Sequence, residues 1–154
     1  MTWTVIPETD AKEVAEALQP VLVDLIDLHL IGKQAHWTVV GERFQSAHER
    51  LDVNVEEWRA WSDDVAERIV TLGHLPRGRG HDVVDESPAG PFPLDWLADG
   101  EAIRLVGERV EATARRARTA QETVADLDVI SDGLLQTIIE GLEMQLWMLR
   151  AHLR

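Results

Sequence analysis

The segment from residue 43 to residue 72, RFQSAHERLDVNVEEWRAWSDDVAERIVTL, decides the fold class of this chain. Its apolar residues recur at intervals of three and four, which is the period of one face of an α-helix. Gly73 follows the last apolar position, as is common where a helix ends. The segment is therefore predicted to form one long amphipathic helix. Its apolar positions are Phe44, Ala47, Leu51, Val55, Trp58, Val65, Ile69 and Leu72.

The same period appears in three further segments, residues 10–35, 95–124 and 130–153. Between the second and third helices lies GHLPRGRGHDVVDESPAGPFP, residues 73–93, which is too rich in Pro and Gly to form one regular element. Its length suits a crossover along a bundle, with room for a short helix inside. We expect no pair of strands. The prediction is an all-α, ferritin-like four-helix bundle with one long connection, formed by a single domain of residues 1–154.

Composition narrows the class of protein further. The chain has no cysteine, which excludes disulfides and thiolate metal sites and fits a cytoplasmic protein. No apolar run has the length of a membrane span, and the start, MTWTVIPETDAKEV, lacks the pattern of a secretory signal. The formal net charge of −13 disfavours nucleic-acid phosphates as partners unless basic residues cluster, and it suits cations instead.

Four potential metal ligands form a polar stripe beside the apolar stripe of the 43–72 helix. They are His48, Asp52, Asp63 and Glu67. Each pair of neighbours, His48 with Asp52 and Asp63 with Glu67, is one helical turn apart. His48 and Glu67 are separated by about 28 Å of helix rise, whereas metal–ligand bonds are about 2 Å long. The two pairs must therefore belong to different sites within one chain.

A symmetry in the spacing suggests how the pairs meet. His48 and Glu67 have the same midpoint in the sequence as Asp52 and Asp63, and Glu56 and Arg59 share it too. Two copies of this helix, antiparallel about a twofold axis at that midpoint, would bring the first pair of each chain to the second pair of the other. Two identical sites would result. We expect Glu56 and Arg59 to form a salt bridge of modest energetic value.

His36 lies at the end of the first predicted helix, after IGKQA. It reaches the His48 end of the site if the first two helices pack antiparallel. The donors are then imidazole nitrogens and carboxylate oxygens, with few ligands in total. Such a set suits Fe(II) and tolerates Zn(II) or Mn(II).

These residues stand in a pattern that resembles Dps, the DNA-binding protein from starved cells, a miniferritin branch of the ferritin-like superfamily. The resemblance is strongest over KQAHWTVVG, AHERLD and DDVAERIVTLGHLPRG, and it continues more weakly through LDVISDGLL to LEMQLWMLRAHL. It implies a hollow dodecamer with ferroxidase sites between twofold-related chains. The implied reaction oxidises Fe(II), preferentially with hydrogen peroxide, and stores a ferric mineral that protects against oxidative stress.

The resemblance also assigns the ligands. One chain supplies His36, His48 and Asp52, and its partner supplies Asp63 and Glu67. Trp37, next to His36, is implied as an electron donor that absorbs stray radicals. The other tryptophans are interpreted as apolar mass for the core or for interfaces: Trp58, Trp61, Trp96 and Trp147.

Two positions depart from the Dps pattern. Thr38 stands where the family often has Asn, and Gly133 stands where many members have an acidic residue near a threefold pore. Three aspartates close to Gly133 are candidates for an iron-entry pore, namely Asp126, Asp128 and Asp132. The alternative is that they merely cap the N-terminus of the fourth helix, where carboxylates are favourable, although capping and pore lining are compatible.

Two other functions stay open at this stage. One is a nucleoid-associated protein that binds and compacts DNA, with the iron site secondary. Against it, neither end of the chain is a basic arm, and the net charge is negative. A strip of arginines in the third helix could bind phosphate, but acids nearby favour a balanced helix face; it holds Arg109, Arg115, Arg116 and Arg118. The last alternative is a structural shell with an inactive metal site.

Overall fold

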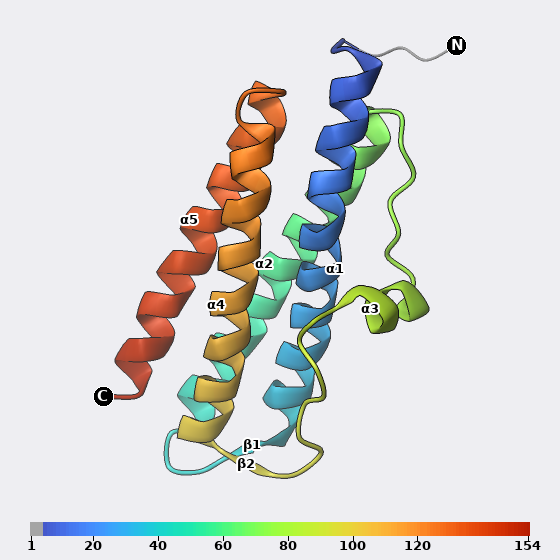
Figure 1. Ribbon diagram of the computed structural model, residues 1–154. Helices are drawn as coiled ribbons and strands as arrows, with labels where there is room; N and C mark the ends of the chain where they lie inside the picture. The colour runs from blue at the N-terminus through green and yellow to red at the C-terminus, as the bar shows by residue number, and fades with distance from the viewer. Residues whose placement is uncertain (1–4) are drawn as a thin grey trace.

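The structure is a computed structural model and describes residues 5–154. Four long helices form the bundle: α1 (Glu8–Thr38), α2 (Phe44–Thr71), α4 (Asp99–Val124) and α5 (Val129–His152) (Figure 1). The crossover between α2 and α4 contains the short helix α3 (Gly80–Glu86). The predicted all-α bundle and the short helix in the long connection are both confirmed. Residues 1–4 of the predicted domain lie outside the described residues.

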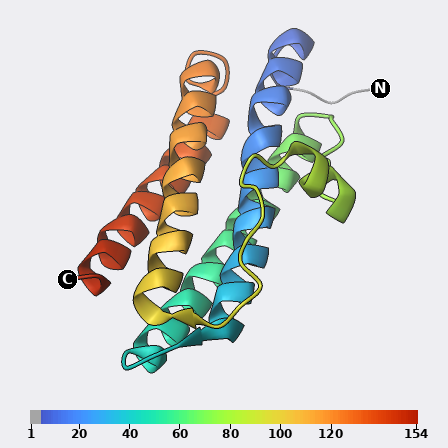
Figure 2. The same cartoon turned by 60° about the horizontal axis from the view of Figure 1, so that its bottom comes forward.

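The helices are arranged as two hairpins, α1 with α2 and α4 with α5, joined by the crossover. Because the crossover returns the chain to the opposite end of the bundle, α2 and α4 run in the same direction (Figure 1). Figure 2 shows the crossover passing across α1 on its way to α4. At its start, Gly73 has a φ of 85°, a left-handed conformation that suits glycine and ends α2 as the sequence predicted.

A short strand pair closes one end of the bundle. Strands β1 (Val39–Val40) and β2 (Leu97–Ala98) are parallel, with Val39 opposite Leu97 and Val40 opposite Ala98. The expectation of no strand pair was therefore wrong. The third long helix was predicted from residue 95 but begins at Asp99. The residues just before it form β2, which pairs with β1 in the connection between α1 and α2. This pairing joins segments far apart in the sequence, so local periodicity does not reveal it.

Trp58 of α2 lies at the centre of the core and is completely buried. Its indole Nε1 donates a hydrogen bond to Oε1 of Gln145 on α5, at 2.8 Å. Gly32 of α1 lies against the other side of the ring: a Cβ added there would come within 2.5 Å of Trp58 Cζ3 and 2.7 Å of Val55 Cγ2. A glycine at this position therefore permits the close approach of α1 and α2.

Gly32→Ala should destabilise the protein, although alanine favours a helix. The hydrogen bond to Gln145 keeps the Trp58 ring from moving away, so overpacking should cost about 1–3 kcal/mol. Gly107→Ala on α4 is the matched control, because its Cβ would meet only Leu149 Cδ1, at 4.0 Å. The control should gain about 0.5–1 kcal/mol from helix propensity. Urea unfolding at a fixed protein concentration measures both changes, and equal stability of the two variants would contradict the close packing of α1 on α2.

The aromatic residues divide between the core and the surface. Trp58 is buried and Trp61 is partly buried, where it packs on the core, whereas Trp37, Trp96 and Trp147 are more than half exposed. In this single chain the exposed tryptophans are therefore not core residues, which leaves an interface role for Trp96 and Trp147. Within residues 5–154, no helix is both long enough and apolar enough to cross a membrane.

Candidate functional site

His36 and His48 come together where α1 ends and α2 begins. The turn through Gly41, with a φ of 131°, reverses the chain direction and sets the two helix ends antiparallel. The two imidazole rings stack, with centroids 3.7 Å apart and planes 20° from parallel. His36 is buried and His48 is half-buried. The two histidines, twelve residues apart, thus lie side by side, as the sequence predicted for antiparallel packing of the first two helices.

Reciprocal hydrogen bonds hold the two rings. Nδ1 of His36 lies 3.0 Å from the backbone carbonyl oxygen of His48, and Nδ1 of His48 lies 2.9 Å from that of His36. A carbonyl oxygen can only accept, so each neutral imidazole must carry its proton on Nδ1 and donate it. Each Nε2 then keeps a free lone pair. Fixing the ring and its tautomer through the other nitrogen is the usual support for a metal-binding histidine.

Asp52 lies beside this pair, one turn after His48. Its Oδ1 is 3.9 Å from Nδ1 of His36, and it accepts a hydrogen bond from Nζ of Lys33 on α1. The hydrogen bond from Lys33 lowers the pKa of Asp52, so the group is a carboxylate at neutral pH. Lys33 was not among the predicted site residues, although its position one turn before His36 puts both on one face of α1.

Asp63 and Glu67 are not brought to His36, His48 and Asp52 in the same chain. They lie further along α2 and are exposed, with about 16 Å of helix rise between Asp52 and Asp63. In the part of the chain that the structure describes, no group of three or more His, Cys, Asp or Glu residues is placed to hold a metal ion. The five predicted ligands therefore form two separate groups in one chain.

Asp63 faces an open hollow of about 580 Å³ beside α1 and α2. His29, Glu56 and Arg59 also line this hollow, which lies at the midpoint of α2. Glu56 and Arg59 form the expected salt bridge within the chain, 3.4 Å long and exposed. The hollow thus borders the second group of candidate ligands, at Asp63.

The three aspartates near Gly133 have different environments. Asp128 is buried and caps α5, because its side chain accepts hydrogen bonds from the backbone N–H groups of Ile130 and Ser131. It also pairs with Arg68 of α2 at 2.7 Å, so its carboxylate is directed into the chain. The capping alternative is confirmed for this residue.

The remaining two aspartates lie closer to solvent. Asp126 is exposed, and Asp132 accepts hydrogen bonds from Gln121 and Gln136, each at 2.7 Å. The predicted pore role of Asp126, Asp128 and Asp132 stays a prediction, and Asp126 and Asp132 are the two that lie near solvent.

The arginines of α4 are mostly balanced by acids, as expected. Arg115 pairs with Glu111, Arg116 with Asp24 and Arg118 with Glu143. Arg109 differs, because it donates to the backbone carbonyl oxygens of Leu105 and Pro91. The strip is therefore not a continuous basic surface.

Known proteins are similar to this chain in sequence and in fold. The sequence profile of the ferritin-like domain matches residues 15–154. The DNA protection during starvation protein of Mycolicibacterium smegmatis is 34% identical over 156 residues, which cover 99% of this chain and 85% of that protein. The fine tangled pili major subunit of Haemophilus ducreyi is 38% identical over 140 residues, covering 91% of this chain and 74% of that protein.

A solved structure of Dps from Microbacterium arborescens in the high iron form has a TM-score of 0.93 and 30% sequence identity, with 99% of each chain covered. The four-helix arrangement and these matches place the chain in the ferritin-like class. Within that class, the chain belongs to the Dps family.

Proposed function

We propose that the chain is a ferroxidase and iron-storage protein whose active sites are shared between two copies of the chain. In each site, His36, His48 and Asp52 of one copy bind iron together with the partner's Asp63 and Glu67. The copies assemble further into a hollow shell of twelve, which stores ferric mineral in the cytoplasm and limits oxidative stress. Iron is the substrate and the stored product in this scheme.

The pair of stacked histidines is the observation that carries the proposal. Their Nδ1 protons are held by backbone carbonyl groups, so both Nε2 lone pairs are available, next to the ionised Asp52. Imidazole and carboxylate donors with open positions suit Fe(II) and leave room for an oxidant. Zn(II) or Mn(II) would be accepted by the same donors, which makes them useful probes.

A second copy of the chain is the occupant that best fits the hollow beside α2. The hollow lies at the midpoint about which the two groups of ligands are symmetric. A twofold axis there would set the partner's histidines next to Asp63 and Glu67. Because the same contact repeats on the other side of the axis, two identical sites would be completed at once. The exposed position of both acids in the single chain is consistent with this arrangement.

The proposed reaction balances two Fe(II) against one hydrogen peroxide. Each Fe(II) gives one electron, the O–O bond breaks, and two water molecules form with two protons taken up. Two-electron reduction avoids release of a hydroxyl radical. In this proposal Trp37, which is exposed and next to His36 in the sequence, supplies an electron when only one Fe(II) is bound.

Lys33 should weaken metal binding, because its ammonium group is hydrogen-bonded to the Asp52 carboxylate, which the metal needs as a ligand. Lys33→Met should therefore bind Zn(II) about tenfold more tightly, a change of about 1.4 kcal/mol. Lys12→Met is the matched control, since Lys12 lies on the same helix and its ion-pair partner within residues 5–154 is the exposed Glu16, at 3.7 Å. Calorimetric titration of the metal-free assembly measures both affinities. Unchanged or weaker binding in the Lys33 variant would show that the ammonium does not compete with the metal.

DNA protection in this protein would come from removing Fe(II) and peroxide rather than from binding DNA. The net charge of −13 and the pairing of Arg115, Arg116 and Arg118 with acids both oppose phosphate binding. Direct DNA binding depends on such phosphate contacts.

The test is anaerobic addition of Fe(II) to the purified protein, followed by hydrogen peroxide. Ferric absorbance should rise much faster than in buffer, with two Fe(II) consumed per peroxide, and the iron should elute with a large assembly during size separation. Oxidation no faster than in buffer, with iron precipitating, would overturn the proposal and leave a structural shell. Omitting peroxide and admitting oxygen instead measures the preference for the oxidant.

A further inference from the structure

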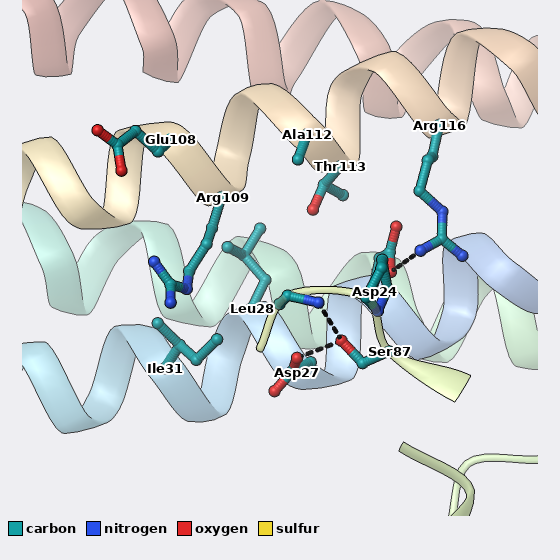
Figure 3. Close-up of a pocket in the computed structure, with 12 residues that line it drawn as sticks. Asp24, Asp27, Leu28, Ile31, Ser87, Glu108, Arg109, Ala112, Thr113 and Arg116 are labelled. Carbon is teal, nitrogen blue, oxygen red and sulfur yellow. Dashed lines mark hydrogen bonds and ion pairs between the residues drawn. The ribbon is translucent and has the colours of Figure 1, made fainter. Parts of the chain in front are cut away.

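A second candidate site lies away from the histidine pair, between α1, α4 and the crossover. It is a cavity of about 330 Å³, at the lower end of the size of small-molecule sites. Leu28 and Ile31 of α1 and Ala112 of α4 give it apolar walls, and the crossover residues Ser87, Pro88 and Ala89 border it (Figure 3). None of the predicted iron ligands lines it, so it is distinct from the ferroxidase site.

Arg109 supplies one end of the cavity with a positive charge. Glu108 also lines the cavity, but its carboxylate pairs with Arg104 rather than with Arg109. The Arg109 guanidinium donates to two neutral backbone carbonyl oxygens and lies 5.0 Å from the centre of the Phe92 ring. Its Nε is buried and has no acceptor, and the hydrogen-bond partners of its guanidinium among residues 5–154 are backbone carbonyl oxygens. Since a buried N–H group without an acceptor is costly, this end of the cavity favours an anionic group.

The other end of the cavity has an excess of negative charge. Asp24 is buried and pairs with Arg116 at 3.0 Å, whereas Asp27 accepts a hydrogen bond from the Ser87 hydroxyl group. No cationic side chain in the described part of the chain pairs with Asp27. The pKa of Asp24 is raised to about 6, because burial and the charge of Asp27 together outweigh the opposite effect of Arg116. One guanidinium thus faces two carboxylates at this end.

The unbalanced charges lie on either side of an apolar surface. Figure 3 shows the Leu28 side chain between the Arg109 guanidinium and the group formed by Asp24, Asp27 and Ser87. A ligand that satisfies both ends needs an anionic group, a cationic group and an apolar part between or beside them.

We propose that this cavity binds a free α-amino acid with an aliphatic side chain. The carboxylate binds Arg109, the ammonium group binds Asp27, and the side chain packs on Leu28 and Ile31. The binding is independent of the iron chemistry proposed above. Its specificity comes from the requirement for both charges, because loss of either one leaves a group of the protein without a partner.

Equilibrium dialysis of the intact assembly against radiolabelled L-leucine tests the proposal. We expect saturable binding with a dissociation constant of about 1 mM or below, the range of a weak small-molecule site. Leucinamide, which lacks the carboxylate, and 4-methylpentanoate, which lacks the ammonium group, should each compete about tenfold less well than unlabelled leucine.

Arg109→Gln and Asp27→Asn should each weaken leucine binding about tenfold or more, since each removes one charged hydrogen-bonding partner. Arg115→Gln is the matched control, because Arg115 is an exposed arginine on the same helix that pairs with Glu111 and does not line the cavity. Ala112→Leu keeps every charge but fills the cavity, and it should abolish binding. Helical content and assembly size show whether each variant is folded.

Three results would overturn the proposal. The first is no retention of leucine by the wild-type assembly at about 10 mM, tenfold above the expected constant. The second is competition by 4-methylpentanoate or leucinamide equal to that of leucine. The third is wild-type affinity in folded Ala112→Leu, or in both charge variants. Because none of these measurements uses iron, they are unaffected by failure of the ferroxidase proposal.

Discussion

Assemblies made of His48→Ala chains alone, or of Asp63→Ala chains alone, should oxidise Fe(II) with peroxide on the order of 100-fold more slowly than the wild type. Co-assembly of the two variants in equal amounts should restore about a quarter of the wild-type rate, because a twofold-shared site is intact only when the Asp63→Ala chain supplies the histidines and the His48→Ala chain supplies the acids. Co-expression with two affinity tags, followed by stopped-flow absorbance, measures the recovery.

The control for this experiment is Asp64→Ala, which removes an exposed acid next to Asp63 that is outside the ligand set. It should keep the wild-type rate. A chain that carries both His48→Ala and Asp63→Ala should be inactive alone. If the mixed assemblies remain as slow as either variant, the two groups of ligands do not come from different chains. If the single variants keep their activity, the five residues are not the ferroxidase site.

Arg68→Met should lower the free energy of unfolding by about 3–5 kcal/mol, the range for removal of one partner from a buried ion pair. Asp128 is only 6% exposed and pairs with Arg68 at 2.7 Å, while Arg68 Nε also donates to the Ser131 hydroxyl group at 2.9 Å. The substitution therefore leaves a buried carboxylate without its counter-ion. Urea unfolding at pH 7 and a fixed protein concentration measures the loss.

The pH dependence gives a second measurement of the same interaction. Burial raises the pKa of Asp128, but hydrogen bonds from Ser131 and Arg68 offset this, so the pKa lies below its ordinary value of 3.8. A carboxylate whose pKa is lowered by folding stabilises the protein when the pH is above the pKa of the unfolded state. That contribution is lost as the pH falls through the pKa of the folded state. The difference in the free energy of unfolding between wild type and Arg68→Met should therefore be largest at pH 7 and should shrink below pH 3.8.

Two further variants separate the ion pair from the helix cap. Arg115→Met removes an exposed arginine of α4 that pairs with Glu111, and it should change stability by less than about 1 kcal/mol. Asp128→Asn in the Arg68→Met background should recover part of the loss, because asparagine caps a helix about as well as aspartate and carries no charge. No recovery would mean that Arg68 stabilises the bundle through its packing rather than through its charge.

The strand pair and the buried aspartate were harder to predict than the helices. Val39 pairs with Leu97 across more than fifty residues, and a two-residue strand has no periodicity of its own. The sequence left capping and pore lining open for Asp128, and the partner that holds it, Arg68, lies on a different helix. Lys33 and the charges around the 330 Å³ cavity were missed because their significance comes from neighbours on other elements.

The helices and the candidate ligands were determined by the sequence itself. Apolar residues spaced by threes and fours must share a face of a helix, and a helix cannot bring His48 and Glu67 together within one chain, since its rise is fixed. The tertiary structure alone decided how the two histidine rings are held. It placed the end of α1 against the start of α2, where two backbone carbonyl groups hold the Nδ1 protons of His36 and His48. Hydrogen bonds between helices depend on their relative position, which local spacing does not specify.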